Sequence, residues 1–136
     1  HKEAVRLKYS EPIEGFLNFL RDAQESYNIA ALSEKEADEE TQDILHSLEL
    51  NENTYHDGAR LSVALAKVRK ERRAAKDTRL QLQPVIDWAG QNTKTVKGLE
   101  QLLGTVRKTE KNLDCRFYKP KTDIVERTLE DKELLG

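Results

Sequence analysis

Apolar residues recur every three or four positions along most of this chain, which is the spacing of one face of an α-helix. The first such stretch predicts a helix from Ser10, a candidate N-cap, to about Ala31. Its apolar positions are Ile13, Phe16, Leu17, Leu20, Ala23 and Tyr27. A second helix is expected from Ser33 to about Asn51, because Ser33 and Glu36 have the spacing of a capping box. Its apolar positions are Ala37, Ile44, Leu45 and Leu48.

The third stretch is the longest, and Thr54 can cap its first turn. Its apolar positions and two arginines alternate at spacings of four and three, as in the seam of a coiled coil. These seam positions are Leu61, Leu65, Val68, Arg72, Ala75, Arg79, Leu82, Ile86 and Ala89. Pro84 predicts a kink or break just before it, because proline removes a helical hydrogen bond. The helix is expected to end around Gly90.

A fourth helix is expected after a cap at Asn92 or Thr93. Its apolar positions are Val96, Leu99, Leu103, Val106 and Leu113. Because the connection is short, the third and fourth helices are expected to lie antiparallel, as a helical hairpin over residues 54–114. Residues 115–121 predict a short extended segment, and residues 123–135 predict a short last helix within a C-terminal extension, 115–136.

The composition supports this all-α prediction of a long helical hairpin or bundle with a coiled-coil-like seam. Half of the residues are Ala, Glu, Lys, Leu or Arg, which is typical of long-helix and coiled-coil proteins. The 136 residues suit a single domain, 1–136, but 37% hydrophobic content and a mean hydropathy of -0.79 predict a thin core. Cys115 is the only cysteine and no apolar run is long enough to span a membrane, so a cytoplasmic protein is expected.

Charge is distributed unevenly along the chain. Residues 33–57 form an acidic segment with nine carboxylates against one lysine, a net of -8. Residues 67–79 carry seven basic side chains against two acidic ones, a net of +5. On a helical projection, five of these cations share a sector of roughly 120°. They are Arg69, Arg72, Arg73, Lys76 and Arg79.

Three interpretations of this basic helix remain open. The cations can form a solvated face along which arginines extend their stems. They can pair with the acidic segment, within one chain or between chains of a homo-oligomer, or with an acidic protein partner. They can also bind the phosphates of a nucleic acid. Because Arg72 and Arg79 occupy seam positions, they need partners or water in any of these cases.

A second candidate nucleic-acid contact is the segment 116–121, where cations alternate with aromatics. Its basic members are Arg116, Lys119 and Lys121. The alternative is that Phe117 and Tyr118 anchor the chain to the helices. A helix-turn-helix around 29–33 is disfavoured, because the following helix is rich in carboxylates that a phosphate-lined groove repels.

No pattern of catalytic or metal-binding residues emerges, so a non-enzymatic protein without cofactor is expected. The pairs Glu36/Glu39 and Glu49/Glu52 superficially resemble the magnesium-holding motifs of all-α nucleotide pyrophosphatases, but too few residues separate them for two facing helices. His46 and His56 lack the further ligands that a zinc site needs. Trp88 is expected to pack where the third and fourth helices meet.

Several charged segments together resemble small, uncharacterised helical proteins of bacteriophages and prophages of Gram-positive bacteria. The segments are 43–50, 68–77, 103–110 and 116–121. The resemblance implies an accessory protein of the host cytoplasm, with a role in nucleic-acid handling or interference with a host system, and no catalytic residues. The favoured hypothesis is a self-associating protein-binding protein. The alternatives are a nucleic-acid binder and, more remotely, a magnesium-dependent nucleotide hydrolase.

Overall fold

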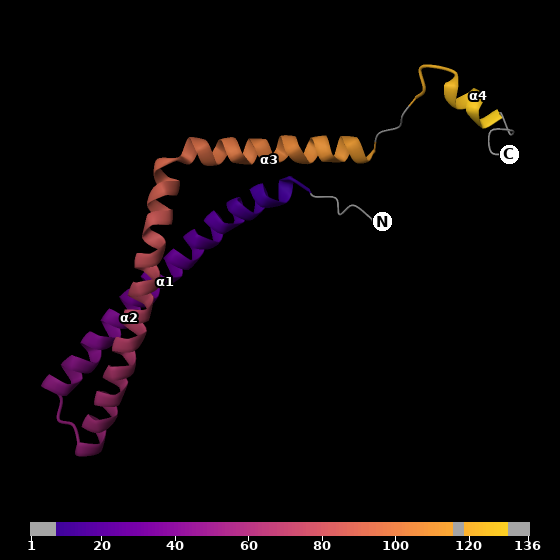
Figure 1. Ribbon diagram of the computed structural model, residues 1–136. Helices are drawn as coiled ribbons and strands as arrows, with labels where there is room; N and C mark the ends of the chain where they lie inside the picture. Colours follow the sequence, from indigo (N-terminus) through magenta and orange to yellow (C-terminus); the bar gives the residue numbers. More distant parts are fainter. Residues whose placement is uncertain (1–7, 116–118, 131–136) are drawn as a thin grey trace.

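The computed structural model describes residues 8–115 and 119–130, and within them it is built from helices and irregular connections. Helix α1 spans Ser10–Leu50, α2 spans Tyr55–Gln91, α3 spans Thr93–Asp114 and α4 spans Ile124–Glu130. The all-α prediction is therefore confirmed. Figure 1 shows α1 and α2 side by side, α3 leaving the end of α2 at a steep angle, and α4 beyond the far end of α3.

Helix α1 is one continuous helix of 41 residues, so the predicted break between Ala31 and Ser33 is wrong. Residues 30–37 contain no proline or glycine, and the apolar spacing carries on through Ala30 and Ala37, which are both buried. The capping box therefore does not form. Ser10 is not the N-cap either: Tyr9 takes that position without a side-chain cap, and Ser10 begins the helix.

Helices α1 and α2 form an antiparallel hairpin around the connection 51–54. Thr54 caps α2 as predicted, because its hydroxyl accepts a hydrogen bond from the Asp57 backbone N–H at 3.1 Å. The predicted α2 seam is confirmed, since all nine of its positions are buried or partly buried. On α1 the facing positions are largely small, with Ala23, Ala30 and Ala37 spaced by seven.

Helix α2 continues through Pro84 to Gln91, so of the kink or break predicted before the proline, the break does not occur. The chain bends instead at Asn92, the single residue between α2 and α3. One residue cannot reverse the chain into a hairpin, so the antiparallel pair predicted over residues 54–114 is not formed. Helix α3 instead packs along the first turns of α1, where Glu110 reaches Ser10.

The core is thin, as the composition predicted. Val96, Leu99, Leu103 and Val106 are buried or partly buried, as their spacing predicted, but Leu113 is exposed and Glu110 takes its place in the repeat. Only six apolar residues among those described are buried. They are Leu17, Ala23, Ala30, Ala37, Val68 and Leu103. Helix α4 begins at Ile124, close to the predicted start, and the rest of the predicted stretch, 131–135, lies outside the described residues. Within the described residues α4 contacts none of the other helices, and the predicted extended segment is irregular where it is described.

Candidate binding surfaces

The middle of the hairpin contains a polar layer made by Glu34 of α1 and the two seam arginines of α2. Arg79 Nε donates to Glu34 Oε1 at 2.7 Å, and Arg72 Nη2 lies 3.9 Å from Glu34 Oε2. Arg72 Nε also donates to Asp38 Oδ1. The Glu34 side chain is only 14% exposed, so this carboxylate lies well inside the interface. Two carboxylates, Glu34 and Asp38, thus balance two arginines that are spaced by seven residues.

The electrostatics of Glu34 follow from these contacts. The hydrogen bond from Arg79 lowers the pKa of Glu34 below its usual value of 4.5, and the positive charges of Arg79 and Arg72 add to this effect. Partial burial opposes it by disfavouring the charged form. The same hydrogen bond raises the pKa of Arg79, so both partners stay charged over the ordinary pH range.

Next to the polar layer, the Tyr27 hydroxyl donates to Gln83 Oε1 at 2.9 Å. Tyr27 pairs with Gln83 and Glu34 with Arg79 and Arg72, so the register of the antiparallel helices is fixed by side-chain hydrogen bonds as well as by packing. The structure therefore supports one of the three interpretations for Arg72 and Arg79, namely pairing with the acidic segment of the same chain.

The other three predicted cations of α2 lie on solvent. Arg69, Arg73 and Lys76 are exposed and, among the residues that the structure describes, have no ion-pair partner. We call these three the basic strip. Lys119 and Lys121 are also exposed but lie beyond α3, far along the chain from the strip. Arg116 falls outside the described residues, as do Phe117 and Tyr118, so the 116–121 prediction stays untested.

A second surface was missed by the sequence reasoning. Phe16 and Phe19 of α1 and Trp88 of α2 remain 39–49% exposed. Phe16 and Trp88 were expected to pack against other helices, whereas no position was predicted for Phe19. The Phe16 and Trp88 rings meet edge to face with centroids 6.0 Å apart, so Trp88 packs on α1 rather than on α3. Together with Leu20, Pro84 and Val85 they line an apolar groove of about 320 Å³, here called the aromatic groove.

The contact between α1 and α3 also includes polar side-chain bonds, which lie near the start of α1. Ser10 donates to Glu110 twice, from its hydroxyl at 2.7 Å and from its backbone N–H at 3.2 Å. The hydroxyl bond chiefly lowers the pKa of Glu110, against the effect of partial burial. On the same pair of helices, Arg107 Nη2 donates to Glu14. These bonds anchor the start of α1 to the last turns of α3.

The remaining chemical candidates are not brought together. Glu36, Glu39 and Glu49 all lie on α1, so they cannot face one another across two helices. No three His, Cys, Asp or Glu residues converge as metal ligands anywhere in the described ranges. The helix-turn-helix considered around 29–33 is absent, because α1 passes through it without a turn. No described helix is both long and apolar enough to cross a membrane.

Comparison of the chain with models of known protein families, with curated proteins and with solved structures finds no match.

Proposed function

We propose that this protein works without catalysis, by binding other proteins through its helical, charge-patterned surface, and that it associates with itself. The observation that carries the proposal is the amount of surface left open. The chain exposes 11585 Å², whereas a compact monomer of 15.7 kDa exposes about 7,300 Å². Within the described residues, no large side chain is fully buried. A pair of helices with so small a buried core is stabilised considerably when another protein surface covers one of its faces.

The distribution of charge supports a role in binding. The carboxylates of Glu36, Glu39 and Glu40 stand exposed on α1, and the basic strip stands exposed on α2. Complementary charges of this kind steer association and select partners more than they add affinity. The proposal includes that the chain is an accessory protein of a phage or prophage and acts in the host cytoplasm. This part rests on the sequence resemblance alone.

Sedimentation velocity over a range from low to tens of micromolar tests the self-association. We expect the mean mass to rise with concentration toward a discrete oligomer, because association depends on mass action. A sedimentation coefficient and mass that stay those of the monomer at tens of micromolar would refute it.

The basic strip supports a second candidate, nucleic-acid binding. Three exposed cations contact at most a few phosphates, so the affinity should be modest and fall with salt. Fluorescence titration with DNA and RNA at low salt compares the wild type with the triple variant Arg69→Ala/Arg73→Ala/Lys76→Ala. The matched control removes three exposed α3 cations, Lys94, Lys97 and Lys108. Loss of binding in the first variant alone supports this candidate, and no binding by the wild type eliminates it.

A further inference from the structure

Helices α1 and α2 lie side by side in a single layer, and the two faces of this layer carry different side chains. One face carries the Arg72–Asp38 pair and, beside it on α2, the basic strip. The other face carries a groove floored by Ala74 and Ala75 of α2. Ala74 points about 140° away from Arg69 and about 160° away from Lys76 around the helix axis. The cations therefore lie on the far side of α2 from the groove.

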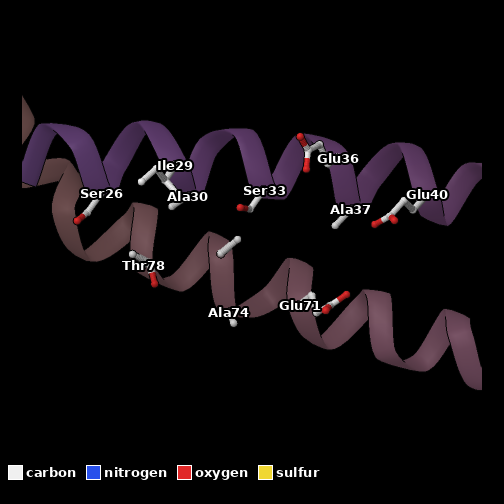
Figure 2. Close-up of a pocket in the computed structure, with 11 residues that line it drawn as sticks. Ser26, Ile29, Ala30, Ser33, Glu36, Ala37, Glu40, Glu71, Ala74 and Thr78 are labelled. Carbon is white, nitrogen blue, oxygen red and sulfur yellow. The ribbon is translucent and has the colours of Figure 1, made fainter.

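Three grooves run one into the next along this second face. The aromatic groove shares Phe19 with a neighbouring hollow of about 380 Å³, which in turn shares Ser26 with a larger groove of about 680 Å³. The larger one, here called the central groove, is lined mainly by small side chains such as Ala30, Ser33 and Ala37. Figure 2 shows these small residues between the two helices, with Glu36, Glu40 and Glu71 gathered toward one end.

The two ends of this grooved face are complementary in shape. One end presents large rings, Phe16, Phe19 and Trp88, that are only half covered. The other end presents a hollow lined mainly by small side chains, with Ile29 and three glutamates beside them. Ser26 lies between them, seven residues after Phe19 and seven residues before Ser33 on the same helix. Consider a second copy of the chain related by a two-fold axis that passes beside Ser26, perpendicular to the helices. This axis places Phe19 of each copy over Ser33 of the other, about 10 Å from the axis.

We propose that two copies of this chain pack antiparallel through the grooved face, so that the Phe19 ring of each enters the central groove of the other. This inference rests on the proposed self-association and names its surface. Interdigitated packing of large and small residues is how helix layers reach interior density. The symmetry makes the contact self-complementary, as two-fold dimer interfaces are.

The area of the face fits a stable dimer. The grooves run along α1 from Gly15 to Glu40, which corresponds to about 39 Å of helix. Two helices side by side are about 20 Å wide, so each copy contributes about 780 Å² and the pair about 1,600 Å², the size of a standard specific interface. The surface in excess of a compact monomer is large enough to supply this area.

The charges also fit a second copy on this face rather than on the other one. Two basic strips brought together would repel each other. On the grooved face Glu36, Glu40 and Glu71 lie toward one end, and Asp22 lines the neighbouring hollow. The antiparallel arrangement keeps the two acidic ends apart, since each lies on its own side of the axis. Parallel packing would place them in contact.

Sedimentation of matched variants tests the surface. Phe19→Glu places a charge where the ring enters the groove, and Ser33→Phe fills the groove from an exposed position. We expect each to weaken dimerisation by about thirty-fold or more, as for an interface hot spot. The control Leu32→Glu changes a similarly exposed residue that points about 140° away from Phe19 around the α1 axis, and it should leave the dimer intact. A dimer that survives Phe19→Glu unchanged overturns the proposed surface, although self-association itself stands.

Cysteine cross-linking in a Cys115→Ser background tests the orientation. Ser26→Cys should form a disulfide-linked dimer with itself, because disulfides require Cα atoms within about 7 Å. Phe19→Cys should cross-link when mixed with Ser33→Cys, and neither variant should cross-link alone. Phe19→Cys that cross-links with itself indicates parallel packing and overturns the proposed orientation.

The only tryptophan reports whether something else covers the face. Trp88 emission should shift to the red on dilution, as the dimer dissociates and the ring meets water. If Trp88 is instead shielded in a monomer and becomes exposed in Leu129→Glu, helix α4 of the same chain occupies the groove. That result overturns the second copy as the occupant.

Discussion

Helix α1 is held by its two partners in different ways. Along its second half it meets α2 through alanines and a polar layer, in which Glu34 bonds to Arg72 and Arg79. Along its first turns it meets α3 through leucine and valine side chains, with Leu103 the most buried on α3. The first contact sets which residues face each other, because a misaligned charge is costly. The second contact depends on apolar area.

The largest effect should come from removing apolar area at the α3 contact. Leu103→Ala is expected to lower the free energy of unfolding by about 3 kcal/mol, since it deletes a buried side chain and leaves a cavity. Urea unfolding followed by circular dichroism measures the loss. Leu102→Ala, at the neighbouring exposed position, should change stability by less than about 0.5 kcal/mol. Equal losses in the two variants would mean that α3 does not pack through Leu103.

The alanine seam of the hairpin should tolerate no larger side chain. Ala30→Leu is expected to cost about 2 kcal/mol, because the extra volume forces α1 and α2 apart. The thermal midpoint, measured by calorimetry, should fall accordingly. Ala66→Leu makes the same change at an exposed position of α2 and should be close to neutral. If Ala30→Leu is neutral as well, the helices are not closely packed at the seam.

The polar layer predicts a dependence on pH. Because the pKa of Glu34 is lowered in the folded state, its stabilising effect is fully present above pH 4.5 and is lost as the pH falls through that value toward the lowered pKa. Glu34→Gln should therefore destabilise the protein at neutral pH, and the difference from wild type should shrink in acid. Glu36→Gln, an exposed glutamate two residues on, is the control. A constant difference across the pH range would contradict the ion pair.

A small gain in stability should come from replacing Thr41, which lies on the seam one heptad after Glu34. Its hydroxyl is buried, and no partner for it exists among the described residues. Thr41→Val keeps the shape and removes the unsatisfied group, so stability should rise by about 1 kcal/mol. Chemical denaturation against Thr41→Ser, which keeps the hydroxyl, isolates the effect. A loss of stability in the valine variant would show that the hydroxyl is satisfied by water.

Much of the local structure could be predicted from the residues. The spacing of apolar positions placed the α2 seam correctly, including its two arginines, because a three-and-four repeat on a helix defines one face whatever packs on it. The Thr54 cap was also predicted, since its hydrogen bond joins residues close in sequence. The capping box at Ser33 was wrong because packing of the whole of α1 on α2 outweighs one local cap.

The candidate surfaces were only partly predictable. Pairing of Arg72 and Arg79 with the acidic segment was among the predicted alternatives, but nothing in the spacing distinguished Glu34 from its neighbours. The aromatic groove was missed because Phe16 falls within the apolar repeat of α1, yet two helices alone cannot cover it.

The local pattern of residues was enough to predict that this chain is helical, where α2 lies along it, and which of its residues form the seam. These properties depend on hydrogen bonds and side-chain spacing within a few turns. The arrangement of the helices in space was needed to show three further features: α1 pairs with α2, α3 turns away at Asn92 and packs on α1, and Arg69, Arg73 and Lys76 stay on solvent while their neighbours pair. Those outcomes depend on contacts between residues far apart in the chain, whose relative positions no local pattern encodes.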